Sequence, residues 1–317
     1  MSEVGALFVI GGAEDKLGRR TVLRDFVEEC GGSDAVIAIV PTASSLGPEV
    51  VEAYGALFER LGAASFRGIR PETRAEADDP SVVAQLEGVT GVFMTGGNQL
   101  KLSAVVSGTA FAAALKDAHR RGVVIGGTSA GASVQSSHMV AFGTGGATPK
   151  QRMTQLAAGL GLLDNCVIDQ HFAQRNRYGR LLSLVAQSPS LLGIGVDEDT
   201  GAVVREERYL EVIGRGAVTI IDGHEMTSNA HAAKRTNPLL VSGARLHVLP
   251  AGAKFDLMRR ELVAASTQVD PAVAEELSAA NADVGRLARD IAAESVSPTN
   301  LRRRRARARI DREDGTE

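Results

Sequence analysis

The amino-terminal half of the chain alternates short apolar runs with longer amphipathic stretches, and this alternation limits the folds open to it more than any other feature. Strands are predicted at Ala6–Ile10, Ala35–Val40, Ser65–Ile69, Gly91–Met94 and Val123–Gly126, with helices between them at Leu17–Glu29, Pro48–Leu61, Pro80–Leu86 and Gly108–Arg121. Continuous apolar strands separated by helices are typical of a parallel sheet covered on both faces. The sequence therefore predicts a three-layer α/β fold with a mainly parallel sheet.

The pattern changes after Asn165, where shorter elements follow one another. A helix is predicted at Tyr178–Gln187, and strands are predicted at Leu192–Val196, Gly201–Val204, Tyr209–Ile213, Ala217–Ile221 and Leu246–Leu249. Turn residues at Glu206-Glu207 and Asp222-Gly223 indicate hairpins. We therefore expect a small antiparallel extension of the main sheet.

A second change at Ala264 divides the chain into a domain over residues 1–263 and an extension over residues 264–317. Apolar residues recur every three or four positions from Val273 to Ile291, which predicts a helix that either docks on its own domain or pairs in a coiled coil. The run Arg302–Arg309 predicts either a solvated, disordered tail or a clasp for a polyanion.

The composition excludes several classes of protein. The 317 residues are 44% hydrophobic and 23% charged, with a formal net charge of −3, so neither nucleic acid nor a membrane surface is an expected partner. The first residues form no leader and no membrane span is evident, which predicts a cytoplasmic location. Cys30 and Cys166 are far apart and no metal-ligand spacing is present, so we expect no metal and no other cofactor.

A candidate nucleophile lies directly after the last predicted strand of the first half. Gly127-x-Ser129-x-Gly131 has the pattern of a nucleophile elbow, in which glycines permit a sharp turn that exposes the serine oxygen. The amide of Ala130 would then help to hold an oxyanion. The alternative is an ordinary glycine-rich turn between a strand and a helix.

A serine nucleophile needs a base, and the base needs an orienting acid. Among the six histidines, His171 is the one that ends an apolar strand within a run of polar groups. The acid could be Asp197, Glu198 or Asp199, which all follow the strand predicted at Leu192–Val196. Spacing alone does not choose among these three carboxylates.

Five motifs in order carry a resemblance to a known family. They are Gly11–Lys16, Thr95–Gln99, Gly126–Ala132, Asp169–Phe172 followed by Arg175, Arg177 and Arg180, and Gly195–Glu198. Between about Val4 and Leu262 the chain resembles the cyanophycinase family of serine peptidases. The resemblance implies a flavodoxin-like sheet of the class I glutamine amidotransferase type, and it suggests a homodimer.

The resemblance also implies roles for particular residues. Ser129 would be the nucleophile, His171 the general base and acid, and Glu198 the orienting carboxylate. The oxyanion donors would be the amides of Ala130 and Gly97. The substrate pocket would be lined by Gln99, Asp169, Gln170, Arg175 and Arg180.

The implied substrate is cyanophycin, a poly-aspartate backbone with arginine joined to each β-carboxyl, which the family cuts to β-aspartyl-arginine. Arg175 and Arg180 offer bidentate donors for its aspartate carboxylates. Asp169, or alternatively Glu14 or Asp15, could accept from its guanidinium groups. Asn98 departs from the family pattern, because an acidic residue is common at that position.

Three other functions remain open at the level of sequence. A related peptidase acting on aspartyl or isoaspartyl dipeptides would share the elbow serine. A binding module could keep the fold without the chemistry. A nucleotide-binding protein could use Gly11-Gly12 and Gly96-Gly97 as phosphate loops, but neither stretch completes a recognised phosphate-binding motif.

Overall fold

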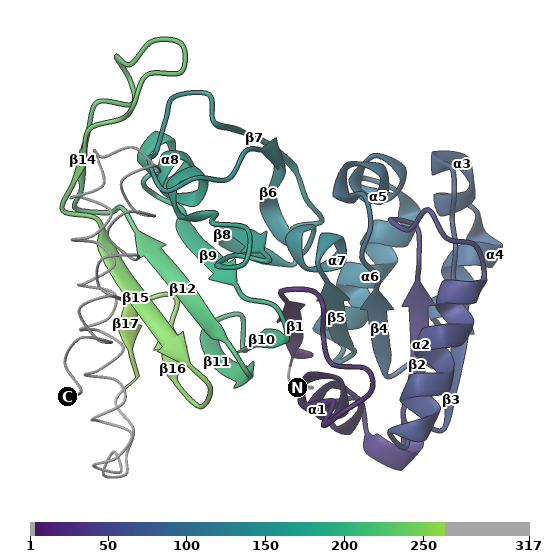
Figure 1. The fold of residues 1–317 in the computed structure, drawn as a ribbon. Coiled ribbons are helices and arrows are strands. Elements are labelled where there is room, and N and C mark those ends of the chain that lie inside the picture. Colours follow the sequence, from purple (N-terminus) through teal and green to yellow (C-terminus); the bar gives the residue numbers. More distant parts are fainter. Residues whose placement is uncertain (1–3, 264–317) are drawn as a thin grey trace, which may run out of the picture. The chain divides into compact units, whose positions relative to one another are not determined.

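The computed structural model of the protein describes residues 4–263, and its largest element is a nine-stranded sheet in the order β17-β16-β11-β10-β1-β5-β4-β2-β3 (Figure 1). These strands are β1 (Leu7–Ile10), β2 (Val36–Val40), β3 (Ser65–Gly68), β4 (Gly91–Met94), β5 (Val124–Thr128), β10 (Thr200–Arg205), β11 (Tyr209–Gly214), β16 (Lys254–Asp256) and β17 (Glu261–Leu262). Strands β1, β5, β4, β2 and β3 are parallel, and the other four are antiparallel. The parallel sheet and its antiparallel extension are therefore confirmed.

A second sheet has six strands in the order β15-β12-β9-β8-β6-β7. They are β6 (Ser136–Gly143), β7 (Thr154–Ala158), β8 (Leu163–Gln170), β9 (Leu192–Val196), β12 (Ala217–Asp222) and β15 (Arg245–Pro250). A separate short ribbon pairs β13 (Thr227–Ser228) with β14 (Val241–Ser242). The strands predicted at Leu192–Val196, Ala217–Ile221 and Leu246–Leu249 thus exist, but they belong to this second sheet rather than to an extension of the first.

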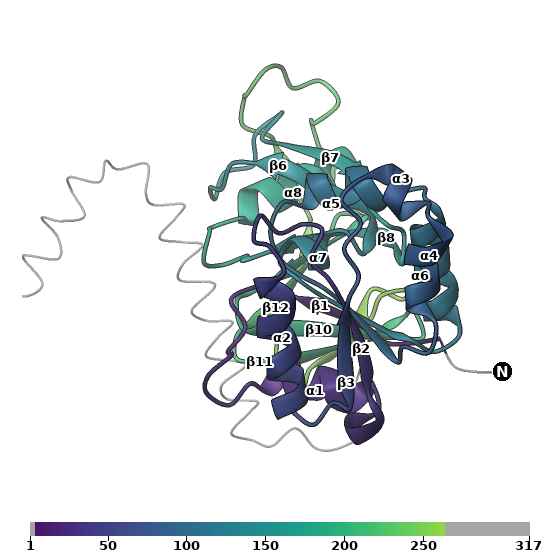
Figure 2. The ribbon, with the colours of Figure 1, turned by 90° about the vertical axis from the view of Figure 1, so that its right-hand side faces the viewer.

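Helices cover both faces of the parallel strands (Figure 2). They are α1 (Thr21–Glu29), α2 (Glu49–Arg60), α3 (Arg74–Ala77), α4 (Pro80–Val83), α5 (Gln99–Val106), α6 (Ala110–Arg120), α7 (Ala130–Ser133) and α8 (Tyr178–Gln187), with 3₁₀ turns at Gly32–Asp34 and Ala84–Leu86. Side chains of α1 and α2 pack on one face, and those of α5 and α6 pack on the other. The second sheet shares the core of that other face, and α8 covers its outer side.

Helix α1 begins later than the predicted residue, Leu17, and the cause lies in one side chain. The Asp15 carboxylate accepts hydrogen bonds from the amides of Leu17 and Gly18 at 3.0 and 2.7 Å, and from Arg20 at 3.1 Å. These bonds fold the segment into a turn, and the left-handed backbone of Arg20 (φ 54°), whose amide Asp15 holds, prevents a helix from running from Leu17 into Thr21. The residues after β1 therefore form a loop at the carboxyl edge of the sheet.

Two further expectations from the sequence concern membrane-spanning helices and the residues after 263. Within residues 4–263, no helix is long and apolar enough to cross a membrane. The predicted helix at 273–291 and the arginine run at 302–309 lie outside the described residues.

Candidate active site

Ser129 lies at the carboxyl end of β5, between the ends of β1 and β4. Its backbone has φ 52° and ψ −106°, a conformation that an L-residue rarely adopts and that costs on the order of 1–3 kcal/mol. Its amide donates to the carbonyl of Ile10 at 2.9 Å, and helix α7 begins at the next residue. This sharp strand-to-helix turn has the form of a nucleophile elbow.

Close backbone contacts explain the two glycines of this turn. A Cβ on Gly127 would lie 2.1 Å from the carbonyl oxygen of Gly131, and a Cβ on Gly131 would lie 2.1 Å from that of Met94. Neither backbone oxygen can move far, because both belong to regular elements. Any larger residue at either position would therefore open the turn that presents Ser129.

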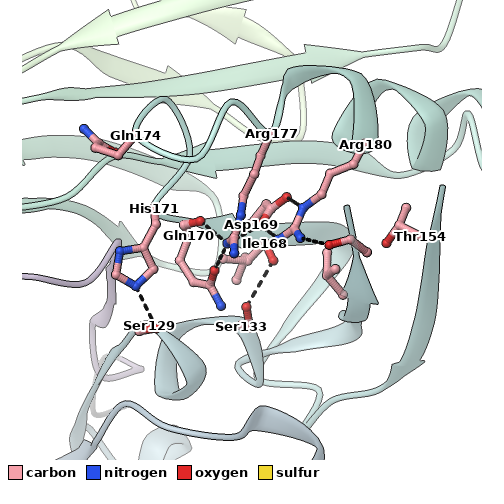
Figure 3. A network of polar contacts seen from close by, with 12 residues as sticks. Ser129, Ser133, Thr154, Ile168, Asp169, Gln170, His171, Gln174, Arg177 and Arg180 are labelled. Carbon is pink, nitrogen blue, oxygen red and sulfur yellow. Dashed lines mark hydrogen bonds and ion pairs between the residues drawn. The ribbon is translucent and has the colours of Figure 1, made fainter. Parts of the chain in front are cut away.

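Ser129, His171 and Glu198 form a chain of hydrogen bonds. The Nε2 atom of His171 lies 3.0 Å from Oγ of Ser129 (Figure 3), and its Nδ1 atom lies 2.6 Å from Oε1 of Glu198. His171 and Glu198 follow the ends of the paired parallel strands β8 and β9 of the second sheet, and Ser129 follows β5 of the nine-stranded sheet, so the site lies where the two sheets meet. The arrangement is that of a serine nucleophile, a base and an orienting acid.

The geometry also distinguishes Glu198 from its two acidic neighbours. Asp197 accepts the amide of Ala173 at 3.0 Å and that of Ala217 at 3.2 Å, so it holds the backbone after His171. Asp199 accepts the amide of Asp15 at 2.8 Å. Of the three carboxylates that remained candidates for the orienting acid, only Glu198 contacts the imidazole.

The environment of His171 favours its neutral form. The His171 side chain is 11% exposed, and burial lowers the pKa of the imidazole below its usual 6.5. The hydrogen bond to Glu198 acts in the opposite direction, whereas the nearby positive charges of Arg175 and Arg177 reinforce the lowering. A neutral imidazole at pH 7 can accept the proton of Ser129.

Two backbone segments border Ser129, and each carries one of the amides expected to bind an oxyanion. Ala130 is the first residue of α7, so its amide has no partner within the helix. The Gly96-Gly97 turn lies against the nucleophile, since a Cβ on Gly96 would be 3.5 Å from Cβ of Ser129. The donors expected at Ala130 and Gly97 are thus on the two segments that border the serine.

Asp169 and Arg180 form a buried ion pair with each other and are not open to a ligand. Asp169 is fully buried and Arg180 is 4% exposed, with Nε of the arginine donating to Oδ2 of the aspartate at 2.6 Å. Arg177 also pairs with Asp169, at 3.1 Å, and contacts both oxygens of Gln170 (Figure 3). The resemblance implies that Asp169 and Arg180 contact substrate directly, but in the structure both instead belong to an internal ion cluster of Asp169, Arg177 and Arg180, in which Arg180 also donates to the carbonyl of Gly143 at 3.0 Å.

Other expected pocket residues differ in how far solvent reaches them. Arg175 is exposed and follows His171 closely, and within residues 4–263 its guanidinium forms no ion pair. Gln99 is half-buried and donates to the carbonyl of Val140 at 3.0 Å. Asn98, which departs from the family pattern, caps α5 by accepting the amide of Leu100 at 3.0 Å.

The two acidic alternatives for binding guanidinium are also used internally. The Glu14 side chain is 1% exposed and bonded to three neighbouring side chains, and Asp15 forms the turn before α1. Sequence reasoning named Arg177 within the matching motif but gave it no role, and it missed the partners of Glu14, because nothing in the order of residues shows that these side chains meet. Among the described residues, no group of three or more His, Cys, Asp or Glu side chains is arranged to hold a metal ion.

Comparison with known proteins shows to which family the chain belongs. The family model of peptidase family S51 matches residues 7–212, which include all three members of the hydrogen-bonded chain. The chain belongs to peptidase family S51. As an S51 member it is a peptidase, and the nucleotide-binding and non-catalytic alternatives lose their support.

Named relatives and a solved structure agree with this assignment. A cyanophycinase of Nostoc sp. strain PCC 7120 is 42% identical over 262 residues, covering 82% of this chain and 88% of the relative. A cyanophycinase of Geminocystis herdmanii is 39% identical over 253 residues, covering 79% of this chain and 93% of the relative. The crystal structure of a peptidase from an acI-B1 actinobacterium has the same fold, with a TM-score of 0.59 and 21% identity over 80% of this chain and 98% of that one.

Proposed function

We propose that this S51 peptidase hydrolyses cyanophycin to β-aspartyl-arginine dipeptides, with Ser129 as its nucleophile. The observation that carries the proposal is the bonded chain of Ser129, His171 and Glu198 in a sequence 42% identical to a cyanophycinase over 82% of its length. The related aspartyl or isoaspartyl dipeptidase remains the function to test against.

The proposed reaction is acyl transfer in two steps. His171 Nε2 takes the hydroxyl proton while Oγ of Ser129 attacks a backbone carbonyl carbon of the polymer. The amides of Ala130 and Gly97 hold the oxyanion, and the C–N bond then breaks as the imidazolium gives its proton to the leaving amine. Water, deprotonated by His171, attacks the ester and releases the carboxylate product and Ser129.

Substrate recognition is assigned to the accessible members of the predicted pocket. The exposed guanidinium of Arg175 is suited to an aspartate carboxylate, and Gln99 lies at the start of α5 beside the oxyanion turn. Gln170 is 4% exposed and is held by Arg177, which pairs with Asp169, and Asp169 in turn pairs with Arg180. In this assignment the internal ion cluster supports the pocket from behind.

The pH dependence of kcat/KM should show an acid limb with a midpoint below pH 6.5. The neutral imidazole of His171 is the active form, and burial lowers its pKa, so protonation inactivates the enzyme only at pH values below the usual histidine range. Replacing Arg175 with Gln removes a nearby positive charge and should move the limb to higher pH. A wild-type midpoint above 6.5 would contradict the account of His171.

The substrate is tested by measuring kcat/KM for soluble cyanophycin, for α-linked Asp-X dipeptides and for β-Asp-X dipeptides under identical conditions. We expect efficient hydrolysis of cyanophycin, with β-aspartyl-arginine as the product identified by mass, and little hydrolysis of either dipeptide. Preferred hydrolysis of a dipeptide, with cyanophycin left intact, would assign the dipeptidase function instead. The cytoplasmic location and the homodimer stay predictions, and sedimentation equilibrium tests the second.

A further inference from the structure

One buried charge beside the active site takes no part in the proposed reaction. The Glu14 side chain lies on the loop after β1 and is 1% exposed. Its Oε2 atom accepts a hydrogen bond from the hydroxyl of Thr128 at 2.6 Å. Its Oε1 atom accepts from the ammonium of Lys16 at 2.8 Å and from the hydroxyl of Tyr54.

These contacts keep Glu14 ionised despite its burial. Burial alone would raise the pKa of the carboxyl, but the Lys16 charge and the three hydrogen bonds outweigh it and hold the pKa below its usual value. A buried carboxylate is costly unless all its contacts are made, so each of these donors is fixed in place by it. Thr128 is the one of these donors that adjoins Ser129 in the chain, and its hydroxyl has a charged acceptor at 2.6 Å.

Thr128 is the last residue of β5 and directly precedes the strained Ser129. A strained conformation persists only where surrounding contacts impose it. The loop that carries Glu14 also contacts the base: the amide of His171 donates to the carbonyl of Gly11 at 2.8 Å, and a Cβ on Gly12 would lie 2.4 Å from Cε1 of the imidazole. One loop therefore touches both the nucleophile's neighbour and the base.

We propose that Glu14 is a positioning residue that, through its hydrogen bond to Thr128, holds the Ser129 elbow in register with His171. This inference rests on the proposed role of Ser129 as a nucleophile, but it does not depend on the identity of the substrate. Glu14 contacts no reacting atom and acts only through Thr128.

The test compares two replacements of Thr128 in the full-length protein. Thr128→Val keeps the shape and removes the hydroxyl, whereas Thr128→Ser keeps the hydroxyl. We expect kcat on soluble cyanophycin to fall roughly 10- to 100-fold in the valine variant, with KM changed by less than about 2-fold, because misplaced groups slow the chemical step more than binding. The serine variant should recover most of kcat.

A second readout separates this inference from the choice of substrate. The rate at which phenylmethanesulfonyl fluoride modifies Ser129 reports how well this serine is positioned to react, and the measurement needs no cyanophycin. We expect this rate to fall in Thr128→Val and in Glu14→Gln by a similar factor. The double variant should be no slower than the slower single variant, because Thr128→Val removes the donor of this hydrogen bond and Glu14→Gln removes the charge of its acceptor, so both changes act on one contact.

Thr90→Val is the matched control, because its hydroxyl bonds the amide of Val36 at 3.0 Å at the opposite edge of the same sheet. It should leave the labelling rate unchanged. Thermal unfolding identifies any variant that fails to fold, in which case the Thr128→Ser and Thr128→Val pair decides. Slow labelling in Thr128→Val with no cyanophycin hydrolysis by wild type would reject the substrate and keep the positioning role. Equal labelling of Thr128→Val and wild type, or additive losses in the double variant, would overturn it.

Discussion

Replacing Ser129 with Ala should reduce the rate of cyanophycin hydrolysis by at least about 10⁴-fold, the largest activity change expected of any substitution in this chain. The loss follows from the geometry, since Oγ of Ser129 is 3.0 Å from Nε2 of His171 and no other hydroxyl contacts the imidazole within residues 4–263. The measurement is the rate of release of dipeptide from soluble cyanophycin by equal amounts of folded protein.

Ser133→Ala provides the matched control for this prediction. Ser133 lies one helical turn further along α7, is fully buried, and donates only a long hydrogen bond of 3.4 Å to the carbonyl of Ile168. Its replacement should leave kcat close to that of wild type. If Ser129→Ala degraded cyanophycin as fast as wild type, the serine-peptidase mechanism would be wrong.

Replacing Asp169 with Asn should lower the free energy of unfolding by about 3–5 kcal/mol, the largest stability change expected here. The substitution keeps the shape of the side chain but removes the charge that two buried guanidinium groups share. Arg177 is 9% exposed and Arg180 is 4% exposed, so neither can replace the lost partner with bulk water. Denaturant unfolding of the two proteins, compared by midpoint and slope, measures the difference.

An exposed ion pair gives the comparison for this second prediction. Asp117 pairs with Arg120 at 3.0 Å on the surface of α6, where both side chains are more than half exposed. Asp117→Asn should change the stability by less than about 0.5 kcal/mol. Equal effects of Asp117→Asn and Asp169→Asn would mean that the buried cluster does not hold the fold together.

Much of the fold could be predicted because its elements are strongly patterned. The helix at Tyr178–Gln187 and the strand at Leu192–Val196 have the predicted bounds, since each presents a clear apolar period between turn residues. The parallel strands of the main sheet are confirmed within one or two residues for the same reason. The elbow could be predicted because Gly127-x-Ser129-x-Gly131 encodes close backbone contacts that only glycine allows.

The arrangement of the second sheet could not be predicted from local pattern, although three of its six strands were predicted as strands. A helix does follow Ser129, but it is short: α7 ends at Ser133 and the chain turns directly into β6 at Ser136–Gly143. The small residues of α7 allow β6 to follow it closely. Strand β6 is stabilised by pairing with β8, whose partner residues lie more than 20 positions further along the chain. Pairing at such separation leaves little trace in local sequence.

The sequence identified the three side chains that meet at the candidate site, but it did not identify the contacts that support them. The resemblance named Ser129, His171 and Glu198, and these three side chains do form one bonded chain. The resemblance also implied that Asp169 and Arg180 line the substrate pocket, where each would bind a group of the opposite charge. Whether a charge meets a ligand or a buried neighbour depends on tertiary contacts, which place these two against each other.

The central claim, that Ser129 forms an acyl-enzyme with cyanophycin, is tested most directly by adding hydroxylamine during turnover. An ester on Ser129 can react with hydroxylamine in place of water, so the fragment that receives the new carboxyl end should appear as its hydroxamate. We predict a hydroxamate fraction that rises with hydroxylamine concentration in wild type, and no product of either kind from Ser129→Ala. Release of free carboxylate alone at every hydroxylamine concentration would contradict the acyl-enzyme.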